Sequence, residues 1–426
     1  MELTKSDLKK SFYGLVPTDW ITCQFQEVLT GFSSGMTPYR AIPEYYKGNI
    51  PWITSGELNY NVITDTIERI TQEAVVKTNL KILPKGTFLM AITGLEAAGT
   101  RGSCAITGVE ATTNQSCMAL FPKEGKIETN YLYHFYVMYG NDLAFKFCQG
   151  SKQQSYTGRI VKILPINLPP TLKEQKAIAT ALSDVDNLIT SLENLIAKKQ
   201  AIKQGAMQQL LTPPHKGGKR LPRFSGEWVE KSLGELGQFK NGVNKGAEDF
   251  GHGKPFINLL DVFGIPSISS DKSLGLINST PEERKIYDLK KGDVLFVRSS
   301  VKPSGVGLTT VIIDDLINSV FSGFLIRFRD NNTLNLTFKI HCFHSKEFRD
   351  KVISSSSSSA NTNINQEALS SLTIWYPPTD SEQKAIAKIL SDMDTELEQL
   401  ETKKAKYQQL KQGMLQELLT GNTRLV

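Results

Sequence analysis

Histidine and cysteine side chains at positions 341–344 (HCFH) are the first residues in this sequence whose types could do chemistry, because both bind zinc. A tetrahedral site needs four such ligands, and no second pair has a spacing that would complete one. The chain has five cysteines, an odd number, and none form a CxxC pair: Cys23, Cys104, Cys117, Cys148 and Cys342. We therefore expect reduced, structural cysteines and no bound metal.

Motifs for DNA modification or cleavage are equally incomplete. Glu283 and Lys285 imitate part of a metal-dependent nuclease motif, but such a charge cluster is typical of a solvated turn. The Pro-Pro pairs at Pro169, Pro213 and Pro377 lack the flanking Asp or Asn and the aromatic residue of an amino-methyltransferase loop. The sequence also has no GxxxxGK[ST] phosphate-binding loop. It therefore predicts no catalytic residues in this chain.

Side chains that could recognise DNA occur in both halves of the chain. Arg, Lys, Asn and Gln bind base edges and phosphates, and the net charge of +6 is compatible with a polyanionic partner. The candidates in the first half are Arg40, Lys47, Arg101, Lys152, Gln153, Gln154 and Arg159. Those in the second half are Lys240, Asn241, Asn244, Lys245, Arg298, Lys302, Asn361, Asn363 and Asn365.

An internal repeat indicates which elements position these loops. Residues 169–212 return as residues 377–420 at a constant shift of 208, and about 25 of 44 positions are identical. Thr171 with Glu174, and Thr379 with Glu382, have the spacing of a capping box at the start of a helix. Each copy would form a helix of about 40 residues and ~60 Å.

Apolar residues recur at intervals of 3 and 4 in both predicted helices, as in a coiled coil. They are Ile178, Leu182, Val185, Ile189, Leu192 and Ile196 in the first copy, and Ile386, Leu390, Met393, Leu397 and Leu400 in the second. We expect the two helices to pair as an antiparallel coiled coil. The alternative is that each apolar stripe packs against its own neighbouring domain.

The remaining segments alternate short β-type runs, such as residues 86–93 and 293–298, with turns and helical stretches near 131–147 and 338–352. This mixture predicts an α+β fold with a pseudo-two-fold repeat. A serine run at residues 354–359 is typical of a flexible surface loop. The expected organisation is globular domain 1–168, helix 169–212, linker 213–225, globular domain 226–376 and helix 377–426.

The two helices are alike although the globular parts have diverged, as expected if the helices meet the same partner. Candidate partner-binding residues at the helix starts are Glu174, Gln175, Lys176, Glu382, Gln383 and Lys384, because both copies keep them at positions expected to be exposed. No apolar run approaches the ~18 residues that span a bilayer, and the N-terminus lacks a signal-peptide pattern. We therefore expect a cytoplasmic protein that does not contact membranes.

The repeated PPxxxEQxxIA helices, the SGMTPYR and GNIPWITSGEL segments from Ser34 and the RLPRFSGEW linker together resemble the specificity subunit of type I restriction-modification systems. The resemblance covers nearly the whole chain. It implies two target-recognition domains for the halves of a split, asymmetric DNA site, with the paired helices as a ruler. It also implies two methyltransferase subunits using S-adenosylmethionine and two restriction subunits using ATP and Mg, with no cofactor in this chain.

Three alternatives remain open at this point. The chain could be a coiled-coil adaptor that binds proteins without DNA specificity. It could retain cleavage or methylation chemistry through residues that the motif search does not detect. It could also serve a methylation-only or type II-like system. Binding that weakens steeply with added salt would favour DNA over the adaptor interpretation, because phosphate contacts release counterions.

Overall fold

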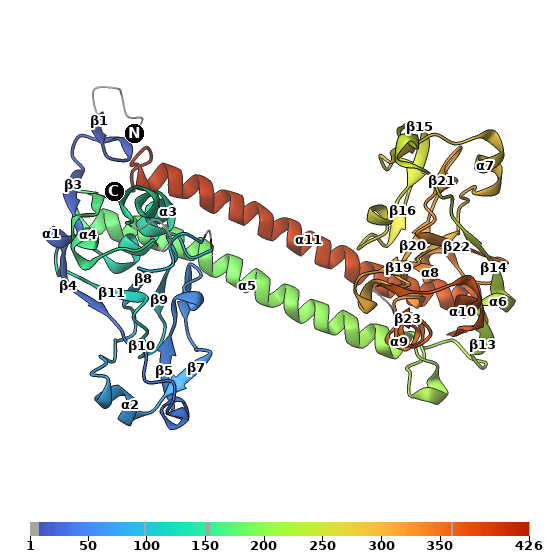
Figure 1. Ribbon diagram of the computed structural model, residues 1–426, viewed down its shortest axis with the longest axis horizontal. Coiled ribbons are helices and arrows are strands. Elements are labelled where there is room, and N and C mark those ends of the chain that lie inside the picture. Colours follow the sequence, from blue (N-terminus) through green and yellow to red (C-terminus); the bar gives the residue numbers. More distant parts are fainter. Residues whose placement is uncertain (1–7, 98, 150–153, 359–360, 426) are drawn as a thin grey trace. The chain divides into compact units, whose positions relative to one another are not determined.

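The computed structural model describes residues 8–97, 99–149, 154–358 and 361–425. The chain divides into two compact units, Met1–Glu193 with Lys403–Val426, and Asn194–Thr402 (Figure 1). Each unit contains one globular part and a portion of each of two long helices. We call them unit 1 and unit 2.

Unit 1 is a mixture of short strands and helices. Its strands are β1 (Leu8–Ser11), β2 (Gly14–Pro17), β3 (Ile21–Gln24), β4 (Leu29–Ser34), β5 (Ile50–Ile53), β6 (Asn61–Ile63), β7 (Glu68–Ile70), β8 (Phe88–Ala91), β9 (Cys104–Thr107), β10 (Thr112–Thr113), β11 (Cys117–Pro122) and β12 (Pro165–Leu168). Its helices are α1 (Phe25–Val28), α2 (Gln72–Lys77), α3 (Thr129–Phe147) and α4 (Gly158–Ile163), with 3-10 turns η2 (Pro43–Tyr46) and η3 (Ser55–Glu57).

Unit 2 is likewise built from short strands and helices. Its strands are β13 (Val229–Ser232), β14 (Gly237–Asn241), β15 (Phe250–Ile257), β16 (Ser267–Ile268), β17 (Gly275–Ile277), β18 (Val294–Val297), β19 (Ser299–Ser300), β20 (Thr309–Ile312), β21 (Val320–Phe321), β22 (Leu325–Asp330), β23 (Ser357–Ser358), β24 (Thr362–Asn363) and β25 (Thr373–Tyr376). Its helices are α6 (Leu233–Leu236), α7 (Pro281–Ile286), α8 (Leu336–Cys342), α9 (Lys346–Ser354) and α10 (Gln366–Ser371), with η4 (Pro214–Lys216), η5 (Ala247–Asp249), η6 (Leu259–Asp261) and η7 (Pro303–Gly305).

Sheet topology repeats between the units. The five-stranded sheet has order β4-β11-β8-β9-β6 in unit 1 and β14-β22-β18-β20-β16 in unit 2. In both, the last strand is parallel to its neighbour and the other pairs are antiparallel. A three-stranded sheet also recurs, β10-β5-β7 and β21-β15-β17, with one parallel and one antiparallel pair. The α+β class and the internal repeat predicted from sequence are confirmed.

The long helices are α5 (Leu172–Leu210) and α11 (Asp380–Leu419). The backbone N–H groups of Glu174 and Glu382 donate to the hydroxyls of Thr171 and Thr379, at 3.2 and 3.3 Å, so the predicted threonine caps are confirmed. The glutamate half of the predicted capping box is wrong, because these carboxylates bind arginines. No helix among the described residues combines the length and apolar character needed to cross a bilayer.

The two long helices run antiparallel within each unit. In unit 2, Lys199 Nζ lies 2.6 Å from Glu396 Oε1, and Lys203 pairs with Asp394. Residue numbers therefore rise along α5 in the direction in which they fall along α11. Unit 1 has the same arrangement, because Lys411 Nζ lies 2.5 Å from Asp186 Oδ1 while Arg424, farther along the chain, binds Glu174, which lies before Asp186. The predicted pairing is therefore correct.

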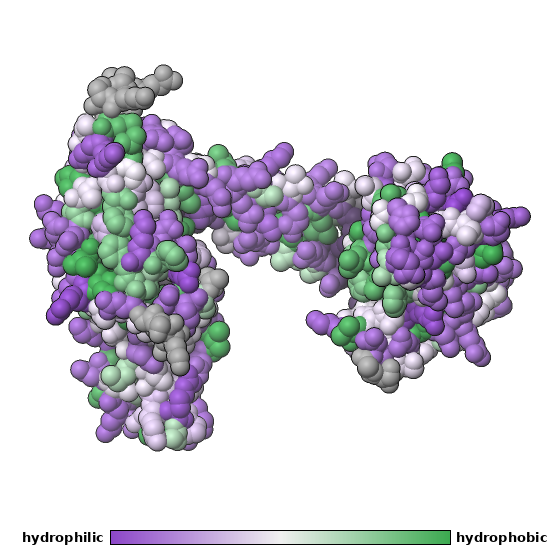
Figure 2. Space-filling view, turned by 45° about the horizontal axis from the view of Figure 1, so that its top comes forward, coloured by the Kyte–Doolittle hydropathy of each residue, from purple (hydrophilic) through white to green (hydrophobic). Residues whose placement is uncertain are grey.

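Packing of the apolar stripes on the globular parts, the alternative interpretation, also occurs at the helix ends. Leu182 of α5 and Leu418 of α11 belong to the core of unit 1 together with strands β8, β9 and β11. Leu390 of α11 and Leu210 of α5 belong to the corresponding core of unit 2. Each globular part is thus held by the start of the helix that follows it and by the end of the other helix. Hydrophilic residues predominate on the helix surfaces visible in Figure 2.

Two further expectations need correction. The single helical stretch expected near residues 338–352 is two helices, α8 and α9, because the Ser345 hydroxyl accepts from Phe348 N and caps a new start. The serine run expected to be a flexible loop ends α9 at Ser354 and contributes strand β23, which pairs with β24. Ser359 lies outside the described residues.

Candidate nucleic-acid interface

In unit 2, several of the predicted DNA-binding residues gather where strand β18 ends. Arg298 follows β18 directly, and its carbonyl accepts from Ile364 N at 2.9 Å. Ser299 of β19 pairs with Asn363 of β24. Arg298, Asn363 and Asn365 line one cavity of about 200 Å³, together with serine residues. The structure therefore brings together an arginine and two asparagines that are far apart in the sequence.

A turn at residues 322–325 connects this cluster to the loop after β14. Arg298 N donates to Phe324 O at 2.8 Å, and Gly323 N donates to Val243 O at 2.8 Å. Asn244 is exposed beside this turn, and Asn241 ends β14. The remaining candidates Lys240, Lys302 and Asn361 are also exposed. Polar groups from four segments thus share one end of the main sheet.

The Arg298 guanidinium keeps hydrogen-bonding capacity for a ligand. Its side chain is half-buried, and among the described residues its guanidinium makes one long hydrogen bond, of 3.4 Å, to Gly323 O. A guanidinium carries five N–H donors in a planar fork, which suits bidentate contacts to guanine or phosphate. Asn365 is less free, because its side-chain oxygen accepts from Ala368 N at 2.8 Å and caps α10.

Unit 1 places candidates at the equivalent strand end. Thr93, just after β8, bridges to Ser155, which corresponds to the pairing of Ser299 with Asn363 in unit 2. Gln154 lies beside this bridge and its carbonyl accepts from Leu95 N at 3.1 Å. Arg101 Nε donates to Leu95 O at 2.8 Å, so Arg101 and Gln154 flank the same loop. Lys152 and Gln153 lie outside the described residues, and Arg159 is exposed on α4.

Three of the other predicted residues are engaged with carboxylates. Arg40 makes a two-pronged contact with Glu68, including Nη2 to Oε2 at 2.8 Å, which lowers the pKa of Glu68. Lys245 Nζ lies 2.8 Å from Glu283 Oε1 and lowers the pKa of that carboxyl. Lys47 lies 3.6 Å from Glu44. Their positive charges are partly neutralised, so they are weaker phosphate ligands than a free cation would be.

The predicted partner-binding residues at the helix starts are mostly not exposed. Glu174 and Gln175 are each 2% exposed, and Glu382 and Gln383 are 1% and 2% exposed, so the premise of exposure is wrong for these four. Lys176 and Lys384 are exposed.

The buried glutamines join each helix start to its own globular part. Gln175 accepts from Glu128 N at 3.0 Å and donates to Lys126 O at 3.2 Å. Gln383 accepts from Asn335 N at 2.6 Å and donates to Thr333 O at 3.2 Å. The identity of these residues in both repeats is therefore explained by contacts inside the chain.

The buried glutamates receive arginines that the sequence analysis missed. Arg424, beyond α11, binds Glu174 at the start of α5 with two contacts of 2.5 and 2.8 Å and also binds Asp19. Arg220, beyond α5, binds Glu382 at the start of α11 at 2.6 Å. Each long helix is thus followed by an arginine that fixes the start of the other one. The sequence signal is only an Arg-Leu pair after each helix, which is weak.

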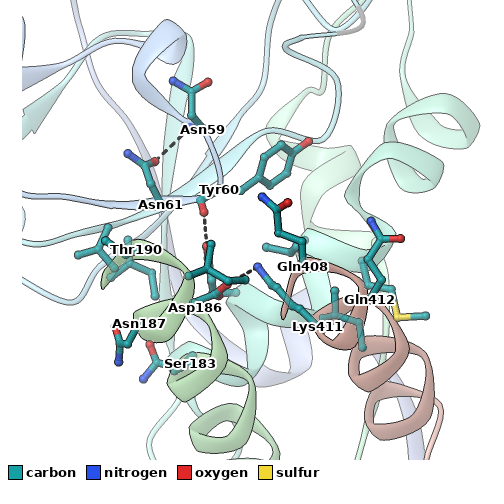
Figure 3. Close-up of a pocket in the computed structure, with 18 of the residues that line it drawn as sticks. Asn59, Tyr60, Asn61, Ser183, Asp186, Asn187, Thr190, Gln408, Lys411 and Gln412 are labelled. Atoms are coloured by element: carbon teal, nitrogen blue, oxygen red, sulfur yellow. Dashed lines mark hydrogen bonds and ion pairs between the residues drawn. The ribbon is translucent and has the colours of Figure 1, made fainter. Parts of the chain in front are cut away.

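One cavity of unit 1 has an acidic lining. It has a volume of about 1200 Å³ and lies among the loop at residues 59–64, α3, α5 and α11 (Figure 3). Among the described residues that line it are three carboxylates, Asp142, Asp186 and Glu193, and one cation, Lys411, which is paired with Asp186. This charge disfavours contact with a phosphate backbone. Among the described residues, no group of three or more His, Cys, Asp or Glu could hold a metal ion.

Comparisons with known proteins identify a family whose members match both halves of the chain. The model of the type I restriction modification DNA specificity domain matches twice, at residues 17–204 and 225–412. The MjaIX type I restriction enzyme specificity subunit of Methanocaldococcus jannaschii is 27% identical over 71% of this chain and 72% of its own. The MjaVIII specificity subunit of the same organism is 23% identical over 100% and 98%.

A solved structure shares the fold. The type I restriction-modification S subunit from M. genitalium superimposes with a TM-score of 0.57 over 94% of this chain and 96% of its own, at 16% identity. The two family matches together span most of the sequence and fall one on each half of the internal repeat. The chain therefore belongs to the type I restriction-modification DNA specificity family and is a non-catalytic specificity subunit.

Proposed function

We propose that this chain recognises a split, asymmetric DNA sequence through its two globular parts, each of which contacts one half-site with the loops at the end of its main sheet. The observation that carries this proposal is the repeated placement of the candidate residues. Arg298 directly follows β18, and Asn363 pairs with Ser299 of the next strand, β19. In unit 1, Arg101 and Gln154 both bond to Leu95 in the loop that follows β8, beside the Thr93–Ser155 bridge. Equivalent frames with different side chains account for two different half-sites.

The recognition domains in this proposal are residues 1–168 and 226–376, with conserved helices at 169–212 and 377–426 and a linker at 213–225. Helices α5 and α11 lie within these ranges. The specificity subunit acts with DNA and with methyltransferase and restriction subunits, and we propose two of each. S-adenosylmethionine, ATP and Mg would be bound by those partners, which would assemble with this chain in the cytoplasm.

Docking of the methyltransferase subunits is proposed at the helix starts. Lys176 and Lys384 are exposed there and occupy the same position of the repeat. Glu174, Gln175, Glu382 and Gln383 would act indirectly, because their buried contacts fix the first turn that carries each lysine. A repeated exposed residue on a repeated rigid element suits two copies of one partner.

Methylation sequencing tests the proposed function directly. The chain is expressed with the methyltransferase subunit of its own system in a host without other adenine methylation, and the modified adenines are mapped. The expected result is one split, asymmetric motif that disappears when this chain is omitted. Unchanged methylation without the chain would contradict the proposal and favour the coiled-coil adaptor.

Individual base contacts are tested with Arg298→Ala. Loss of a bidentate base contact costs about 1–3 kcal/mol of discrimination at one position, so tolerance should rise at one base pair of one half-site. Lys231→Ala is the matched control, because Lys231 is an exposed lysine on β13 of the same unit. Equal effects of the two variants would exclude a specific role for Arg298.

A further inference from the structure

We propose that two matched quartets of polar residues, each built around a buried histidine, position each recognition domain on the helix pair and thereby set the accuracy with which each half-site is recognised. The unit 1 quartet is His134, Ser183, Asp186 and Lys411, and the unit 2 quartet is His341, Ser391, Asp394 and Lys203. This inference rests on the proposed function, because it assigns positioning residues for the same DNA-recognition loops.

In unit 1 the quartet joins three segments. His134 of α3 is fully buried, and its Nε2 lies 3.0 Å from Ser183 Oγ of α5. Its Nδ1 faces Asp186 of α5 at 4.0 Å, and Asp186 pairs with Lys411 of α11 at 2.5 Å (Figure 3 shows the Asp186–Lys411 pair). The recognition domain, its own helix and the helix of the other repeat therefore meet at one point.

Unit 2 repeats this geometry with residues from the corresponding positions. His341 of α8 is 3% exposed, and its Nε2 lies 2.9 Å from Ser391 Oγ of α11. Its Nδ1 faces Asp394 at 4.0 Å, and Asp394 pairs with Lys203 of α5. Ser391, Asp394 and Lys411 each lie 208 residues beyond Ser183, Asp186 and Lys203. The histidine–serine and histidine–aspartate distances are nearly equal in the two units, which indicates that both quartets have the same role.

The serine, histidine and aspartate do not form a hydrolytic site. Each aspartate is paired with a lysine, whereas a catalytic triad uses it to orient and stabilise the histidine. Burial and the lysine charge lower the pKa of His134 to about 3, and burial and Lys203 lower that of His341 to about 4. The imidazoles are therefore weak bases, and their role is to hold direction-specific hydrogen bonds.

The histidine helix connects to the recognition loops through the core of its own unit. Tyr133, beside His134 on α3, donates from its hydroxyl to Tyr60 O at 2.6 Å, and Phe135 belongs to the core containing β8. In unit 2, Phe338 and Phe343 near His341 pack in the core that contains Val294 and Phe296 of β18. Rotation of α3 or α8 on the helices would therefore move the strand ends that carry the DNA-recognition residues.

Ser183→Ala and Ser391→Ala test this inference in the full complex with the methyltransferase subunits. Each removes the hydroxyl that bonds to the histidine and leaves a good helix former. Methylation is measured on the cognate site and on DNA libraries substituted at one position at a time in either half-site. Ser191→Ala is the matched control, because the exposed Ser191 hydroxyl bonds only to Asn187 O of its own helix.

Ser183→Ala should lower discrimination at one half-site about three- to tenfold, as expected for loss of one hydrogen bond, and leave the other unchanged. Ser391→Ala should affect the opposite half-site. Lys411→Met should resemble Ser183→Ala, while Lys411→Arg should restore discrimination because it keeps the ion pair. Methylation that falls in parallel on all DNAs, or the same half-site affected by both serine variants, would overturn the inference. A wild-type complex without sequence preference would instead overturn the proposed function.

Discussion

Arg424 and Arg220 each bind a glutamate that is almost removed from water, Glu174 and Glu382 respectively. A buried pair contributes little net stability when formed, because both ions lose hydration. Removing one partner is different, because an uncompensated charge then stays buried. These arginines are therefore sensitive positions although they lie outside the long helices.

Arg424→Met should lower the free energy of unfolding by about 3–5 kcal/mol, because Glu174 then remains buried without a cation. Adding Glu174→Gln should recover part of this loss. Urea denaturation followed by circular dichroism measures both variants. Lys176→Met, an exposed change two residues along α5, is the control and should have little effect. A double variant less stable than Arg424→Met would contradict this account.

His134 gives the chain a pH dependence whose sign follows from its low pKa of about 3, which arises from burial and from Lys411. Below about pH 6.5 the unfolded chain binds a proton at this imidazole, whereas the folded chain does not until near pH 3. Stability from neutral His134 is thus complete above pH 6.5 and is lost as pH falls toward 3.

The midpoint of thermal unfolding should therefore fall as the buffer is acidified from about pH 7 to about pH 5. His134→Gln, which cannot take up the proton, should show a shallower fall. His252→Gln changes an exposed histidine and should keep the wild-type slope. Identical slopes for wild type and His134→Gln would show that His134 does not govern this range.

At the scale of elements, α5 and α11 were predictable because the sequence signals that specify them lie within the helices or at their starts. The threonine caps and the apolar residues at intervals of 3 and 4 specify a helix wherever it packs, and the repeat doubles the signal. The break between α8 and α9 was missed because Ser345 caps a helix only if the chain turns there, which depends on tertiary packing.

Leu182→Ala and Leu390→Ala should each cost about 2–5 kcal/mol, because both side chains are fully buried at the same position of the repeat and truncation leaves a cavity. Denaturant unfolding compares them with Leu188→Ala, which changes a leucine that is 36% exposed on the same helix. A loss for Leu188→Ala as large as for Leu182→Ala would mean that the α5 face carrying Leu188 is also covered.

At the scale of the whole molecule, each unit is completed by residues from the distant repeat. Glu174 and Arg424 are 250 residues apart, and no local sequence pattern predicts an ion pair between them. Sequence alone therefore predicted the order of domains and helices but not the contacts that close each unit. The individual DNA-contacting residues remain predictions, because their roles depend on the bound DNA.

Truncation before Gly421 removes Arg424 and should loosen the start of α5 without loosening the start of α11, whose glutamate is held by Arg220. Hydrogen exchange measured by mass spectrometry should show faster exchange in residues 172–182 and unchanged exchange in residues 380–390. Arg220→Met should give the opposite pattern. Equal acceleration of both segments by either change would show that the two arginine contacts are not independent.

The reciprocal arginine contacts and the matched quartets also limit which substitutions this sequence can accept during evolution. A substitution at Asp186 must be tolerated by Lys411, and one at Glu174 by Arg424, although more than two hundred residues separate each pair. Each long helix contacts both the domain before it and the opposite helix, so a substitution in one copy must be compatible with both partners. The strand-end loops are not held by these paired contacts. We therefore expect substitutions among relatives to concentrate in the strand-end loops, while selection keeps the two helices alike.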